Sequence, residues 1–185
     1  MLELEYPRDL VMIGAIFGIA CFVWAGWAQA GPPGQWWWRV VLGVLGLAGL
    51  VLAAVSIPMA INHWNMPTAL RSGTTALLVY IIVFWVEMIL AGLLVFLAVR
   101  AERTDLIAPL VLVVVGIHFL ALAPVFGQPV LYLAGALLSA AAIIAVLLPE
   151  SSIESSFWCG ILGAPIFLGV GIWTATAAGR AFVHA

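Results

Sequence analysis

The chain contains no lysine, and charged residues of all kinds make up only 8% of its 185 positions. A soluble domain carries about 25% charged residues, because its surface has to be hydrated. The few charges present here cannot cover a globule of this length, so most of the outer surface must face lipid. The net charge is −2, without a run of like charges, so we expect no nucleic-acid partner.

Motifs of the common enzyme and metal-binding classes are lacking as well. Cys21 and Cys159 stand apart, without a C-x-x-C pair, and we expect free thiols in apolar surroundings. The sequence has no G-x-x-x-x-G-K-[ST], no G-x-S-x-G and no H-E-x-x-H, and no cluster of carboxylates that would bind a divalent metal. We therefore expect neither a metal nor a cofactor, and the sequence favours a protein that is not an enzyme.

Long apolar runs fill the rest of the chain, and hydrophobic residues reach 66%. A hydrocarbon core of about 30 Å needs roughly 20 apolar residues per helix. Six segments satisfy this requirement, at residues 10–28, 37–61, 73–99, 106–126, 129–148 and 157–178. The fold class predicted is all-α: a polytopic integral membrane protein in which residues 1–185 form one compact bundle of six transmembrane helices. Because the linkers are short, we expect consecutive helices to pack as antiparallel neighbours.

The second segment carries a stripe of small residues, Gly43, Gly46 and Gly49, that would let another helix approach closely. Its end resembles the end of the fifth segment, and F-W-V-E-M-I-L-A-G in the third segment resembles F-W-C-G-I-L-G-A-P in the sixth. Two three-helix halves of opposite orientation would explain both similarities, as in many transporters. Chance similarity between apolar segments is the alternative, and it is the more frequent outcome.

Only two ionisable residues fall well inside a predicted span: Glu87 in the third and His118 in the fourth. Charged groups are costly within a bilayer, so each such residue is a candidate site. Glu87 lies 13 residues before Arg100, and His118 lies 15 residues after Arg103. If the two spans form a hairpin, a rise of about 1.5 Å per residue puts both groups at nearly the same depth. We therefore expect that they could meet.

Such a pair has a structural and a functional interpretation. As a structural contact, each group satisfies the other in hydrocarbon and joins two helices. As a site, it is pH-sensitive, because burial disfavours both charged forms while pairing favours them. A site of this kind suits proton coupling or a cationic solute. Tyr80 and Phe84 share the helix face of Glu87 and are the predicted lining of a mostly apolar pocket.

A second polar group follows the second span. It contains Asn62, His63 and Asn65, with Arg71 close behind. Capping and anchoring at the membrane interface explain it most simply. The alternative is a vestibule that recognises the polar end of a solute.

The function predicted is a small transporter or a solute-binding membrane subunit with a pH-sensitive site at Glu87 and His118. Its partners would be membrane lipids and a small-molecule solute, and a homodimer or a partner membrane subunit is also compatible with the sequence. The location expected is a bacterial cytoplasmic (inner) membrane. The main alternative is a non-transporting accessory or assembly protein whose glycine-rich second span docks on a partner. An intramembrane lipid-modifying enzyme is a third, less favoured alternative.

Overall fold

The computed structural model describes residues 5–148 and 153–183, and these form helices and connections without a strand. Six of the helices are long and apolar enough to cross a membrane. They are α1 (Pro7–Trp27), α2 (Trp36–Asn62), α3 (Thr75–Arg100), α4 (Ile107–Phe126), α5 (Pro129–Leu147) and α6 (Ser155–Val183). Short 3-10 turns, Ala28–Ala30 and Thr104–Leu106, follow α1 and precede α4. The all-α, six-helix membrane bundle predicted from the sequence is confirmed.

Local signals in the sequence explain where the helices begin and end. Pro7 and Pro129 occupy the first position of α1 and α5, where a missing N–H costs nothing. Thr74 caps α3 by accepting a hydrogen bond from the backbone N–H of Leu77, at 3.3 Å. Gly127 ends α4 in the left-handed conformation, with φ of 62°. The largest difference from the prediction is in α6, which begins at Ser155 and continues to Val183, beyond the predicted residues 157–178.

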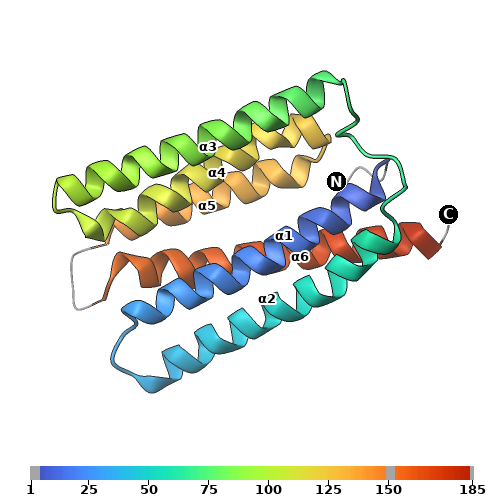
Figure 1. Cartoon of the computed structure of the whole chain (residues 1–185). Coiled ribbons are helices and arrows are strands. Elements are labelled where there is room, and N and C mark those ends of the chain that lie inside the picture. The colour runs from blue at the N-terminus through green and yellow to red at the C-terminus, as the bar shows by residue number, and fades with distance from the viewer. Residues whose placement is uncertain (1–4, 149–152, 184–185) are drawn as a thin grey trace.

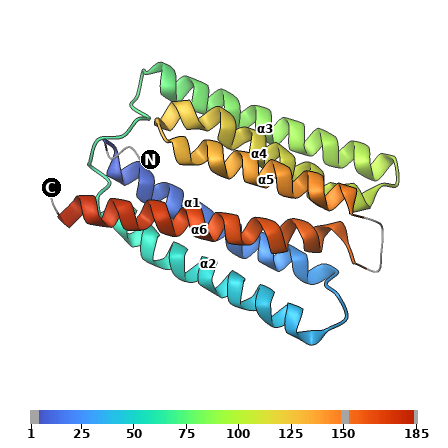
Figure 2. The same ribbon diagram turned by 180° about the vertical axis from the view of Figure 1, so that it is seen from behind.

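The helices form two groups of three, as Figure 1 and the reverse view in Figure 2 show. One group contains α1, α2 and α6, and the other contains α3, α4 and α5. The expectation that consecutive helices pack as neighbours is therefore wrong for α2 and α3, which share almost no contacts among the described residues. Instead α1 packs most closely on α6 and α2, and α6 also contacts α5. The connection formed by residues 63–74 is long enough to pass from one group to the other.

Small residues allow the backbones to approach closely within each group. Between α1 and α2, a Cβ on Gly18 would lie 2.7 Å from the carbonyl oxygen of Gly49. Between α4 and α5, a Cβ on Gly116 would lie 2.9 Å from the carbonyl oxygen of Gly135. In both pairs one glycine faces another across the helix crossing, as expected for helix association in lipid. The likeness of the two crossings agrees with a repeat that relates α1 and α2 to α4 and α5.

The core where the groups meet is aromatic. Phe17 of α1 packs edge to face on Phe119 of α4 and on Phe167 of α6, with ring centroids 4.8 and 5.4 Å apart. This geometry is the favoured one for aromatic rings. Cys21 and Cys159 are buried free thiols, as predicted. Large apolar side chains also cover the outside of the bundle, which is the pattern of a protein whose solvent is lipid.

Candidate functional site

The structure brings the two intramembrane ionisable residues together. Glu87 lies near the midpoint of α3, and its Oε2 is 2.9 Å from Nδ1 of His118 on α4. The side chains are 12% and 11% exposed, respectively. Although the atoms are within ion-pair distance, Nδ1 of His118 has no hydrogen-bond partner of acceptable geometry. The contact is therefore close but poorly aligned, and it leaves the hydrogen-bonding capacity of the pair incompletely used.

The pair forms part of the wall of a cavity of about 460 Å³. This volume is within the range of small-molecule sites, roughly 300–1,000 Å³. Most of the wall comes from α1, α3 and α4, and Tyr80 and Phe84 line it beside Glu87, at the positions expected from helical spacing. Tyr80 also packs edge to face on Phe126 of α4, with centroids 6.0 Å apart. The part of the wall formed by α3 and α4 therefore places one carboxylate, one imidazole and one phenol among apolar side chains.

A complete wall of the cavity comes from α1, which the sequence did not associate with the site. The α1 residues that line it recur every three or four positions from Arg8 to Trp24. Arg8 and Trp24 lie 16 positions apart, so the cavity extends along α1 for about 24 Å. Ile16 and Val23 are about half exposed, at 50% and 51%, and α1 and α3 share almost no direct contact among the described residues. The cavity therefore reaches the lipid-facing surface between these two helices.

The polar end of the cavity is formed by Arg8, Asp9 and Thr68. Asp9 is only 4% exposed and accepts a hydrogen bond from the backbone N–H of Ala69, at 2.8 Å. Arg8 donates to the carbonyl oxygen of Trp64, at 2.9 Å, and its guanidinium lies 4.3 Å from the centre of the Trp64 ring. Both charges thus hold the connection between α2 and α3 over the start of α1.

The four residues predicted as a vestibule lie around that connection but do not line the cavity. Asn62 is the last residue of α2, and Asn65 and Arg71 are exposed. His63 stacks on Phe182 of α6, with ring centroids 3.8 Å apart, and its Nδ1 lies 2.8 Å from the carbonyl oxygen of Met59. These contacts fit the capping and anchoring interpretation. In the sequence, Asp9 was the residue that could have indicated the polar end of the cavity, because a carboxylate at the start of an apolar helix needs a partner.

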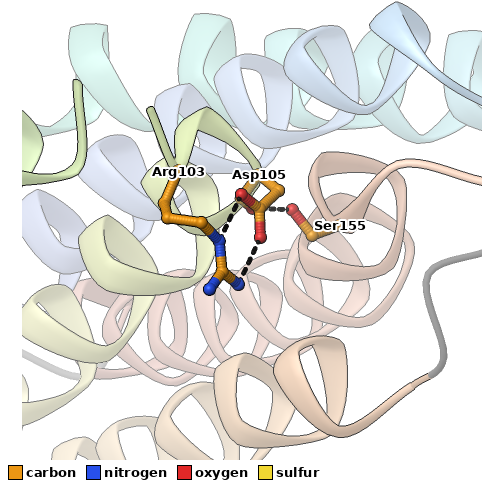
Figure 3. Close-up of polar contacts among 3 residues, drawn as sticks. All are labelled: Arg103, Asp105 and Ser155. Carbon is orange, nitrogen blue, oxygen red and sulfur yellow. Dashed lines mark hydrogen bonds and ion pairs between the residues drawn. The ribbon is translucent and has the colours of Figure 1, made fainter. Parts of the chain in front are cut away.

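A different polar cluster closes the opposite end of the bundle (Figure 3). The guanidinium of Arg103 donates two hydrogen bonds to the carboxylate of Asp105, at 3.1 and 3.0 Å. The hydroxyl of Ser155 donates to the backbone carbonyl oxygen of Asp105. These contacts join the start of α4 to the start of α6. The Arg103 and Asp105 side chains are 53% and 39% exposed, so this pair contributes little to stability.

Comparison with protein-family models, with curated proteins and with solved structures found no match to this chain. Within residues 5–148 and 153–183, no group of three His, Cys, Asp or Glu side chains could bind a metal ion. The function therefore has to be argued from the cavity and from the pair in its wall.

Proposed function

We propose that the chain is a small proton-coupled transporter or a solute-binding membrane subunit, and that its solute occupies the cavity beside Glu87 and His118. One observation carries the proposal: Glu87 of α3 and His118 of α4, each well inside a membrane-spanning helix, meet in the wall of a cavity of about 460 Å³. Such residues are expensive in a bilayer and are retained where they bind a solute or move a proton. The bacterial inner membrane expected from the sequence belongs to the same proposal.

The geometry favours this proposal over a purely structural contact. Two groups that only join α3 to α4 would be sealed from the cavity and aligned for a hydrogen bond, because an unsatisfied polar atom in hydrocarbon is costly. Here both side chains keep about a tenth of their surface exposed, and Nδ1 of His118 is left without a hydrogen bond. A solute with a polar group could form the hydrogen bond that Nδ1 of His118 lacks. Histidine is also the side chain whose charge ordinarily changes between pH 5 and 8.

The first test is thermal unfolding of the purified protein in detergent, with a panel of small solutes and over a range of pH. A ligand at about 100 times its Kd stabilises the folded state by about 2.7 kcal/mol, which corresponds to a rise in Tm of several degrees. We expect at least one solute to give such a rise in the wild type. The rise should be lost in Glu87→Gln and in Ala20→Trp, because the first removes the carboxylate and the second fills the cavity from α1.

Ala54→Trp is the matched control, because Ala54 is exposed on the outer face of α2 and is remote from the cavity lining. This variant should keep the full solute-dependent rise in Tm. In sealed vesicles, a gradient of the same solute should drive proton movement with the wild type and not with Glu87→Gln. A solute response that survives both Glu87→Gln and Ala20→Trp would place the binding site elsewhere and refute the proposal.

An accessory or assembly role is the second candidate, and two glycines favour it. Gly43 on α2 and Gly92 on α3 have open space where a Cβ would be, so both could face another membrane protein. Gly46 and Gly49 are on the α1 side and are used within the chain. Gly43→Ile distinguishes the candidates: it should leave the solute response intact if the chain is a transporter. Loss of a co-purifying membrane partner in Gly43→Ile would favour the accessory role.

A further inference from the structure

Aromatic side chains from three helices line the cavity. Tyr80 and Phe84 of α3 and Phe119 of α4 line it beside the pair, and Trp24 lines the far end of the α1 wall. Phe119 also packs edge to face on the His118 ring, with centroids 5.4 Å apart. Ring faces attract cations, most strongly where water is excluded. A positively charged group near Glu87 would therefore meet a carboxylate in a wall that also contains aromatic side chains.

The charges that line the cavity differ in how far they are already engaged. Within the described residues, its ionisable lining consists of Arg8 and Asp9 on α1, Tyr80 and Glu87 on α3, and His118 on α4. Arg8 contacts Trp64 through its guanidinium, although its Nε has no hydrogen-bond partner, and Asp9 accepts from the backbone of Ala69. Glu87 has only the poorly aligned contact with His118. Glu87 is therefore the charge most available to a ligand, and its sign selects a cation.

The shape and the opening of the cavity decide what kind of cation fits. It extends for about 24 Å along α1, its wall is mostly apolar, and it reaches the lipid-facing surface at Ile16 and Val23. A small hydrated ion would gain nothing from such a wall and would lose its water. An organic cation with a large apolar body would bury that body against the wall and keep its charge near Glu87.

We propose that the site binds lipophilic organic cations, such as amines or quaternary onium ions, and exchanges each one for a proton of the Glu87–His118 pair. This inference rests on the proposed function and names its substrate class. A bound cation would lie within a few ångströms of the imidazole, so a protonated His118 would repel it. Binding therefore releases the imidazole proton to water, and protonation of His118 releases the cation. Charge balances, because one positive charge replaces another beside the same carboxylate.

The test compares two ions of the same shape and opposite charge, tetraphenylphosphonium and tetraphenylborate. Their binding to the full chain in detergent is measured by calorimetry, with Ala20→Trp as the background for partition into micelles. We expect the phosphonium ion to bind, with an affinity that rises by up to about tenfold per pH unit where one proton is exchanged. Repeating the titration in buffers of different ionisation enthalpy should show up to one proton released per cation. Tetraphenylborate should not bind above background.

Glu87→Gln should weaken phosphonium binding by about tenfold or more, because a charge-assisted contact is lost. Ile89→Ala, on the lipid-facing side of α3, should leave it unchanged, since Ile89 is 67% exposed and is not in the cavity wall. If Glu87→Gln does not fold, the comparison of the two ions and its pH dependence in the wild type still decide the question. Equal binding of both ions, or affinity independent of pH, would overturn the inference.

The outcome for the substrate class can be separated from that of the proposed function. If a neutral or anionic solute stabilises the protein and the effect requires Glu87, the proposed site stands and the cation class is wrong. If no solute of any charge stabilises the wild type, both proposals fail.

Discussion

The double substitution Glu87→Leu/His118→Leu is expected to give a protein that folds as stably as the wild type and binds no solute at the site. Replacing a buried ion pair by apolar side chains of similar volume is often neutral or stabilising by about 1–4 kcal/mol, because neither charge then has to be desolvated. The same change removes the carboxylate and the imidazole that α3 and α4 contribute to the cavity wall. Measured on one preparation of the double variant, the Tm should therefore stay at the wild-type value or rise, whereas solute binding should be lost.

Glu87→Leu alone is the informative comparison. It leaves the imidazole of His118 in an apolar wall without the neighbouring carboxylate, and an unsatisfied buried polar group costs about 1–3 kcal/mol. We expect its Tm to fall and the second substitution to restore it. If the double variant is as unstable as Glu87→Leu, the two side chains do not interact as a pair, and a site that depends on both of them is contradicted.

Gly18→Val is expected to prevent α1 and α2 from packing, at a cost of about 3 kcal/mol or more. A Cβ at this position would lie 2.7 Å from the backbone of Ala53 and from the carbonyl oxygen of Gly49, and neither can move without displacing its helix. Gly49→Val should be equally damaging, since its Cβ would lie 2.6 Å from the carbonyl oxygen of Gly18. Yield of monodisperse protein and Tm in detergent measure the effect.

Gly43→Val is the matched control, because it makes the same substitution in α2 where nothing lies within 4 Å. It should retain the wild-type yield and Tm. Should Gly18→Val and Gly43→Val behave alike, the close approach of α1 and α2 would not be a determinant of folding.

The spans were predictable from the sequence because hydropathy and the effects of proline and glycine at helix ends are local. Pro7, Pro129 and Gly127 mark helix ends whatever the tertiary structure is. Packing order was not predictable in the same way. In lipid, the buried face of a helix is as apolar as its outer face, so the pattern does not indicate which helix is the neighbour. Nothing in the residues around Gly14 showed that Ala175, in the sixth span, would be its contact.

The site was predictable in part for a related reason. Glu87 and His118 are polar, and counting residues from the α3–α4 connection gave them a common depth. The α1 wall could not be inferred, because Ile16 and Val23 look like residues that face lipid. The predicted first span begins at residue 10 and so leaves out Arg8 and Asp9, whereas α1 begins at Pro7. The sequence therefore predicted a polar vestibule at a different place, formed by Asn62, His63, Asn65 and Arg71.

The position of α6 has a consequence for how the protein is assembled during synthesis. The pairs α1–α2 and α4–α5 are adjacent in the chain, so each can form its glycine crossing soon after insertion. The helix α6 contacts both α1 and α5, and it is inserted after all of its partners. Until then, the face of α1 that includes Gly14 lacks its contact with Ala175 of α6. The cavity can thus gain its final α1 wall only after the sixth helix has been inserted and fixes α1 against the other group.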